Sequence, residues 1–334
     1  MVGCGAQAGA VLALGHDFCF RDQAVVRPRS ADAAVLKRKT GRKTHYRGGS
    51  RIISEFVEKT IDVEGHKARY LTAGEGPPLV LLHGVGTSSG EWSWGCLTWR
   101  VTTASYAIDL PGYDGTYDPP DYSPAFTASF VNSFLDAVGA ESAVVVGNSF
   151  GGLVALHLAL SEPARVSALV LSDSAGLGRV VSPVLAAVTL PGGGELATAL
   201  AKTPPGAAQR SFRRALLMFA RPWQIPWKWV NDQYKLAQLP NFTDATLASL
   251  RTTVGATGQR EVLLDRLPEL QMPTLIVWGI EDRVLPYSQA KDAIALVQDG
   301  SLELISNCGH LPHVEQPKRF ASILDDFLVQ EGLH

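Results

Sequence analysis

Ser149 is the residue of this 334-residue chain whose surroundings most clearly allow covalent chemistry. It stands in the run Gly147–Gly151, which reads GNSFG and has the pattern G-x-S-x-G. The apolar run 142–147 is typical of a buried strand, and the run 151–160 is typical of a helix. A serine on a sharp turn between these elements faces substrate, and the flanking glycines let strand and helix approach closely. We therefore interpret Ser149 as a nucleophile.

A serine nucleophile of this kind needs a histidine base and a carboxylate that orients the base, in the chain order serine, acid, histidine. Asp282 follows the apolar strand predicted at 273–279, and His310 follows the strand predicted at 301–306. We take Asp282 as the acid and His310 as the base, because each lies in a loop just after a strand.

Backbone N–H groups near the nucleophile are also expected to take part. The strand predicted at 78–82 ends in His83-Gly84-Val85-Gly86. The N–H of Val85 and the N–H of Phe150 form the predicted oxyanion hole, since both would face the charge that develops on a reacting carbonyl. His310 and His313 have an H-x-x-H spacing without further ligands nearby, so we expect no metal site and no cofactor.

Five landmarks together resemble the α/β-hydrolase fold superfamily, and the resemblance extends from about Arg51 to the C-terminus. They are LLHG at 81–84, DLPG at 109–112, GNSFGG at 147–152, WGIED at 278–282 and the pair Gly309-His310. The resemblance implies that Ser149, Asp282 and His310 are nucleophile, acid and base. Dehalogenases and epoxide hydrolases of this superfamily carry an aspartate at the first of these positions, so the serine implies ester-type chemistry.

Two other carboxylates compete with Asp282 for the role of the acid. Glu281 adjoins it, but the superfamily it resembles usually uses the second acidic position of this loop. Asp173 follows the strand predicted at 167–173, and some hydrolases take their acid from that strand end. Asp282 is the assignment we carry forward.

The fold class predicted for the chain is α/β. Helical patterns separate strands predicted at 78–82, 104–109, 142–147, 167–173, 273–279 and 301–306. An opening hairpin with its turn at Glu64-Gly65 precedes them. This alternation predicts a mostly parallel, doubly wound sheet of about eight strands with helices on both faces. The hydrolase core would comprise residues 51–175 and 259–334.

The strand pattern stops between Gly176 and about Gly258, where prolines alternate with helical apolar patterns. We interpret residues 176–258 as a helical cap inserted after the sixth strand, which related hydrolases place over the active site. Trp223, Trp227 and Trp229 are the predicted substrate-binding wall. The alternative is that these aromatic residues only form the small core of the cap.

Charge is distributed unevenly along the chain. Residues 21–51 hold ten Lys/Arg against two Asp, whereas residues 52–334 hold twenty Lys/Arg against twenty-nine Asp/Glu. The acidic body argues against nucleic acid as a partner. Residues 1–50 are expected to be a basic, disordered extension, with a targeting segment as the alternative.

Length, hydropathy and cysteine content are those of a single α/β protein. No uninterrupted apolar stretch of about 18 residues occurs, so we expect no transmembrane segment and a cytoplasmic location. The four cysteines are scattered without C-x-x-C spacing, so neither a disulfide framework nor a zinc site is expected.

The predicted function is hydrolysis of a small or medium apolar carboxylic ester through an acyl-enzyme. A carbon–carbon bond hydrolase of the meta-cleavage type is the first alternative, because its members resemble this chain at GNSFGG and in their helical cap. Those enzymes commonly have a Gly-Pro-Gly-like oxyanion loop and a tryptophan after the histidine, where this chain has 85–90 (VGTSSG) and Leu311. A cofactor-free perhydrolase, an acyltransferase and a non-catalytic ligand receptor are further alternatives.

Overall fold

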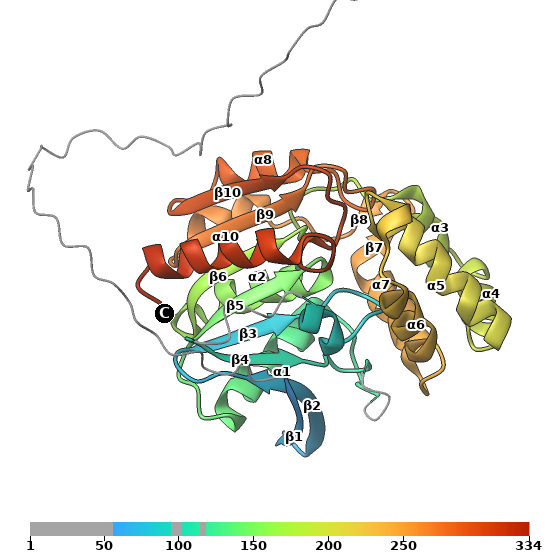
Figure 1. Cartoon of the computed structure of the whole chain (residues 1–334), viewed down its shortest axis with the longest axis horizontal. Helices are drawn as coiled ribbons and strands as arrows, with labels where there is room; N and C mark the ends of the chain where they lie inside the picture. The colour runs from blue at the N-terminus through green and yellow to red at the C-terminus, as the bar shows by residue number, and fades with distance from the viewer. Residues whose placement is uncertain (1–55, 95–101, 114–117, 334) are drawn as a thin grey trace, which may run out of the picture.

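The computed structural model describes residues 56–94, 102–113 and 118–333, and an eight-stranded sheet runs through them (Figure 1). Its strands are β1 (Val57–Val63), β2 (His66–Ala73), β3 (Pro78–Leu82), β4 (Ala104–Ile108), β5 (Ala143–Asn148), β6 (Val166–Ser172), β9 (Thr274–Gly279) and β10 (Gly300–Ile305). Their order across the sheet is β1-β2-β4-β3-β5-β6-β9-β10. Only the pairs β1–β2 and β2–β4 are antiparallel, which confirms the predicted mostly parallel sheet.

The opening hairpin forms where the sequence predicts it. Its two-residue turn is Glu64-Gly65, and both residues have positive φ, 53° and 82°. Such a turn matches the right-handed twist of the strands it joins. Asp62 supports the turn, because its Oδ1 accepts the N–H of Gly65 at 2.9 Å.

Both faces of the central sheet are buried, as alternate residues of one strand illustrate. Val80 and Leu82 of β3 pack on one face with α1 (Pro124–Ala137), α2 (Phe150–Ser161) and α8 (Ser288–Ile294). Leu79 and Leu81 pack on the other face with α10 (Pro317–Gln330). Strands covered on both faces read as continuous apolar runs, which is why the central strands were recognisable in the sequence.

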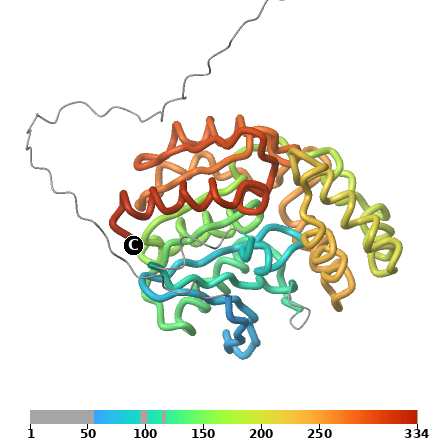
Figure 2. Tube along the Cα trace, in the orientation of Figure 1, coloured from blue at the N-terminus to red at the C-terminus, as the bar shows by residue number. Residues whose placement is uncertain are grey.

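A group of helices occupies the chain between β6 and β9 and lies at one end of the sheet (Figures 1 and 2). It comprises α3 (Pro183–Thr189), α4 (Gly193–Ala201), α5 (Pro204–Met218), the 3-10 helix η4 (Pro222–Gln224), α6 (Trp227–Leu236) and α7 (Phe242–Thr253). Prolines open α3, α5 and η4 because the first turn of a helix needs no N–H donor there. The sequence did not predict the short ribbon of β7 (Val254–Gly255) and β8 (Gly258–Gln259) that follows α7. We call residues 176–258 the cap.

Several expectations concern the ends and the environment of the chain. The predicted extension 1–50 lies outside the described residues, as do three of the four cysteines; Cys308 is buried and free. In the described ranges no single helix is long and apolar enough to cross a membrane. Helices α3 and α4 reach that length and apolar content together, but the chain bends by 95° between them.

Candidate active site

Ser149 lies on the turn between β5 and α2, with φ 54° and ψ −115°. A non-glycine residue in such a conformation costs about 1–3 kcal/mol, which the surrounding structure must offset. Two glycines make the turn possible. A Cβ on Gly147 would lie 2.2 Å from the carbonyl oxygen of Gly151, and a Cβ on Gly151 would lie 2.3 Å from that of Leu82. Only glycine therefore permits this close approach of strand and helix.

Backbone hydrogen bonds hold the Ser149 turn in place. Its N–H donates to the carbonyl of Ser172 at 3.0 Å. Its own carbonyl accepts the N–H groups of Gly152, Leu153 and Ala175 at 3.0 to 3.2 Å. The turn is thus tied to the end of β6 and to the first turn of α2, so the direction of the Ser149 side chain is set by elements far apart in the sequence.

His310 and Asp282 form a buried pair in the loops after β10 and β9. His310 Nδ1 lies 2.7 Å from Asp282 Oδ2, and the two side chains are 3% and 0% exposed. Asp282 Oδ1 accepts the N–H groups of Val284 at 2.7 Å and Leu285 at 3.1 Å. Because Nδ1 is engaged, Nε2 is the ring nitrogen available to a nucleophile. Ser149 and His310 both line one cavity.

The backbone of His310 is anchored from two directions. Its N–H donates to the carbonyl of Met218, at the end of cap helix α5, at 2.8 Å. Its carbonyl accepts Nδ2–H of Asn148 at 3.1 Å, and the same amide donates to the carbonyl of Ser172. Asn148 thus connects the Ser149 turn to the His310 loop through these two hydrogen bonds.

The competing carboxylates occupy other places. Glu281 is exposed, and its Oε2 accepts the N–H of Cys308 at 2.9 Å. Asp173 is buried behind Asp282, where its Oδ1 accepts the N–H of Gly279 at 2.9 Å. Burial, together with the charge of Asp282, raises the pKa of Asp173 well above its usual range, which favours its protonated form. Asp282 is therefore the carboxylate that contacts His310.

The ligand atoms of Asp173, Asp282 and His310 lie within 4.8 Å of one another, which is also a spacing suited to a cation. The hydrogen bonds of the group argue for a different use. Asp282 accepts two backbone N–H groups and contacts the imidazole, while Asp173 accepts a backbone N–H. Metal ligands must be deprotonated, and the raised pKa of Asp173 works against that. The arrangement is better suited to orienting His310.

Val85 and Phe150, the residues predicted for the oxyanion hole, line the same cavity as Ser149. Within the described part of the chain, no hydrogen bond engages the backbone N–H of either residue. The loop that carries Val85 is supported by His83, whose Nδ1–H donates to the carbonyl of Gly84 at 2.8 Å while its Nε2 accepts the N–H of Leu110 at 3.0 Å. Burial lowers the pKa of His83, which keeps its ring neutral and fit to accept.

The cavity has a volume of about 830 Å³ and lies between the Ser149 turn and the cap. Apolar side chains from cap helices and their connections form much of its wall, among them Leu185, Val188, Leu196, Leu217, Leu247 and Leu250. A concave, mostly apolar cavity with a few polar groups is typical of a small-molecule site.

The structure contradicts the prediction that three tryptophans form the substrate-binding wall. None of the three tryptophans lines the cavity. Trp223 and Trp227 are 79% and 78% exposed. Trp229 is buried, packs edge-to-face on Phe219, and donates its Nε1–H to Glu91 Oε1 at 3.2 Å. The prediction failed because three aromatic residues close in sequence point in different directions once η4 and α6 are formed.

Sequence reasoning missed four charged residues that line the cavity: Glu91, Arg210, Arg213 and Arg214. Arg210 and Arg214 are four residues apart on α5, so they lie on the same side of this helix. That spacing was a usable signal, but nothing in the sequence indicated which face of α5 meets the core. Glu91 stands in a short 3-10 helix, Ser89–Trp94, that has no strong pattern.

Comparison with known proteins adds four findings. Residues 79–323 match the model of the alpha/beta hydrolase family. The chain is 33% identical over 279 residues to an uncharacterized protein of Mycobacterium tuberculosis, covering 80% of this chain and 79% of the relative. It is 30% identical over 295 residues to 2-hydroxymuconate semialdehyde hydrolase of Pseudomonas putida, covering 84% and 98%. Among solved structures, a bacterial membrane phospholipase A aligns with a TM-score of 0.70 and 25% identity, covering 84% of this chain and 88% of that one.

Proposed function

The chain belongs to the alpha/beta hydrolase family, and we propose that it is a serine hydrolase that cleaves carboxylic esters of small to medium apolar substrates through an acyl-enzyme. The observation that supports this most directly is the buried contact between His310 Nδ1 and Asp282 Oδ2 in a cavity that Ser149 also lines. A serine hydroxyl is a weak nucleophile near pH 7, and an oriented neutral imidazole removes that limitation.

The proposed reaction has two halves. In the first, His310 Nε2 accepts the proton of Ser149 as Oγ attacks the ester carbonyl, and the N–H groups of Val85 and Phe150 stabilise the oxyanion. The tetrahedral intermediate collapses, the proton passes from His310 to the leaving alcohol, and an acyl-Ser149 ester remains. In the second, His310 activates a water that attacks this ester, which releases the acid and restores the serine. Asp282 keeps the imidazole oriented and stabilises its cation.

A chain-length series of 4-nitrophenyl esters tests this function. We expect turnover with a rapid initial release of 4-nitrophenol equal to about one molecule per active site, because an acyl-enzyme accumulates when its hydrolysis is slower than its formation. Intact-mass measurement during turnover should show the protein heavier by one acyl group, located on Ser149 by peptide mapping. An acyl group on another residue, or no turnover of any ester, would contradict the proposal.

Chain-length preference should respond to the cavity wall and not to the exposed tryptophans. Leu247 is 8% exposed and lines the cavity, so Leu247→Ala enlarges it and should shift the ratio of kcat/KM between long and short esters by about 10-fold, as expected of a pocket that discriminates about 1–3 kcal/mol per methylene. Trp223→Ala and Trp227→Ala serve as controls and should change this ratio less than about 2-fold. A larger shift in either tryptophan variant would show that the tryptophan contacts the substrate and that the original prediction was right.

A carbon–carbon bond hydrolase is the second candidate. The relative that favours it is 2-hydroxymuconate semialdehyde hydrolase, which this chain covers over 98% of its length at 30% identity. The cavity residue Leu311 and the loop around Val85 differ from the pattern common to such enzymes. A meta-cleavage dienone assayed beside the ester series separates the two candidates: a kcat/KM for the dienone above that of every ester would favour carbon–carbon cleavage.

A further inference from the structure

Two arginines meet at one point of the cavity, beside the loop that carries Val85. Arg210 Nη2 donates to the carbonyl of Gly86 at 3.1 Å, and Arg214 Nη2 donates to the carbonyl of Val85 at 3.2 Å. A Cβ placed on Gly86 would lie 2.9 Å from Arg210 Nη2 and 3.0 Å from Arg214 Nη1. Both guanidinium groups therefore adjoin the same backbone position, and both residues line the cavity.

These two cations lack a full set of counter-charges. Within the described residues, neither arginine has a carboxylate within ion-pair distance, and Arg210 Nη1 and Arg214 Nε have no hydrogen-bond partner. Arg210 instead lies over the ring of Phe242, 5.5 Å from its centre. Burial, together with the charge of Arg214, lowers the pKa of Arg210. Guanidinium pKa values are so high that both groups remain charged near pH 7.

Glu91 is the carboxylate that faces this pair, and other groups already engage it. Its Oε1 accepts the N–H of Trp229 at 3.2 Å, and its Oε2 lies 3.8 Å from His313 Nε2. Burial alone would raise the pKa of Glu91, but His313 and Arg214 together hold it below its usual value. The site thus holds one buried carboxylate and two guanidinium groups, so it carries an excess positive charge.

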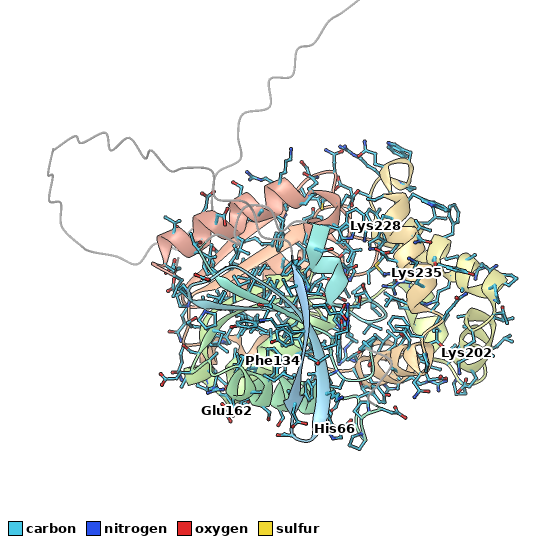
Figure 3. All side chains as sticks on the ribbon, turned by 60° about the horizontal axis from the view of Figure 1, so that its bottom comes forward. His66, Phe134, Glu162, Lys202, Lys228 and Lys235 are labelled. Carbon is cyan, nitrogen blue, oxygen red and sulfur yellow. The ribbon has the colours of Figure 1, made fainter. Side chains whose placement is uncertain are left out.

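The wider charge distribution has the same sign. The cap holds nine Lys/Arg against three Asp/Glu, whereas the remainder of residues 52–334 holds eleven against twenty-six. Lys202, Lys228 and Lys235 extend from the cap, at the opposite side of the molecule from Glu162 (Figure 3). A basic cap over an acidic body attracts anions toward the cavity and raises their local concentration.

A short stretch of one loop connects the place beside the nucleophile to the place beside the arginines. Gly86 is two residues beyond Gly84, and a Cβ on Gly84 would lie 3.2 Å from Cβ of Ser149. A ligand anchored by the arginines would therefore extend past the Ser149 turn into the apolar part of the cavity. The geometry suits an amphiphilic molecule with one anionic group and an apolar body.

We propose that Arg210 and Arg214 form an anion subsite, and that the substrate of this cavity carries a free carboxylate in addition to the bond that is cleaved. The identity of that bond rests on the proposed function, whereas the subsite does not. Arginine pairs bind carboxylates through several charge-assisted hydrogen bonds, and the apolar wall accommodates the rest of the molecule.

Matched substrates test the subsite. Mono-4-nitrophenyl adipate and suberate, which carry a free carboxylate, are compared with their methyl-capped diesters. We expect the wild type to favour the free acids in kcat/KM by about 10-fold or more, mainly through KM, since a hydrogen bond to a charged group is stronger than one to a neutral group. Arg210→Gln and Arg214→Gln should each lower this preference about 10-fold. Lys235→Gln is the matched control, because Lys235 is an exposed cation of the cap that does not line the cavity, and it should keep the preference within about 3-fold.

A second measurement does not depend on turnover. Hexanoate should raise the Tm of the wild type more than hexanamide at the same concentration, and this difference should vanish in Arg210→Gln. Retention of the difference in Arg210→Gln and Arg214→Gln would overturn the subsite, as would equal turnover of free acids and diesters by the wild type. An equal loss of preference in Lys235→Gln would also overturn it, because the preference would then come from the overall positive charge of the cap and not from the two arginines.

The outcomes separate the subsite from the hydrolase function. If no ester is cleaved but hexanoate binds in an Arg210-dependent way, the subsite stands and the ester hydrolase fails. If esters are cleaved without preference for the free acid, the hydrolase stands and the subsite fails. The comparison within the wild type remains decisive even if an arginine variant does not fold.

Discussion

Ser149→Ala and His310→Ala are each expected to lower ester turnover by about 10⁴-fold or more while the protein remains folded. The proposed mechanism makes both residues parts of one acting unit, since Ser149 supplies the nucleophile and His310 takes its proton. The fold should persist because the contacts of the Ser149 turn are made by its backbone, and alanine keeps the Cβ that the turn already accommodates. The measurements are kcat/KM on a 4-nitrophenyl ester and the Tm of each variant.

The double variant is the control for this interpretation. Residues that act as a unit are non-additive, so Ser149→Ala/His310→Ala should be scarcely slower than either single variant. Substantial turnover by Ser149→Ala would refute its role as the nucleophile. If the variants lost activity only because their Tm fell and they unfolded, the two residues would stabilise the fold and would not take part in the chemistry.

Asp282→Asn should cause the second largest loss, about 10³- to 10⁴-fold in kcat. Asp282 Oδ1 accepts two backbone N–H groups, and an amide oxygen can keep that place. The amide nitrogen would then face His310 Nδ1, where the carboxylate now accepts. An N–H donor at this point favours the wrong imidazole tautomer and removes the charge that stabilises the imidazolium. Single-turnover kinetics would locate the loss in the chemical step.

Glu281→Gln and Asp173→Asn are the matched controls for Asp282→Asn. Both substitutions keep the shape of the side chain. In the described residues neither carboxyl forms a hydrogen bond with His310, so each should change kcat by less than about 10-fold. If Asp173→Asn were the damaging change instead, the acid would be Asp173 and the assignment of Asp282 would be wrong.

Asp173→Asn also has an expected signature in stability against pH. The folded protein keeps Asp173 protonated above the pH at which the unfolded chain loses this proton, because the pKa of Asp173 is raised in the fold. The folded state then binds more protons than the unfolded state, so this group makes wild-type stability fall as pH rises above about 4. Asparagine cannot ionise. The free energy of unfolding of the variant should therefore gain on that of the wild type as pH rises, which urea titrations at several pH values would measure.

The sequence determined the sheet and the positions from which the site is built. The strands predicted at 142–147 and 301–306 lie within one residue of β5 and β10. Strands buried on both faces are continuous apolar runs, and such a run can be recognised from the sequence of the strand alone. Because parallel strands end at the same edge of the sheet, the loops holding Ser149, Asp282 and His310 had to converge there.

Other features depended on contacts between distant segments. Asn148 connects the Ser149 turn to the His310 loop only because the loop lies within hydrogen-bond distance of its side chain. The pKa of Asp173 is raised because the residue is buried and because Asp282 lies beside it. Sequence spacing carries no information on either approach.

The orientation of the cap helices was decided by the tertiary structure alone. Trp223 and Trp227 were predicted to line the substrate pocket but are exposed, while Arg210 and Arg214, which the sequence did not single out, line the cavity. Periodicity shows that a helix has two faces, yet it does not say which face covers a cavity when the helix lies between a core and a ligand site. The sequence thus determined which residues can perform the chemistry, and the packing of the cap on the sheet decided what surrounds the substrate.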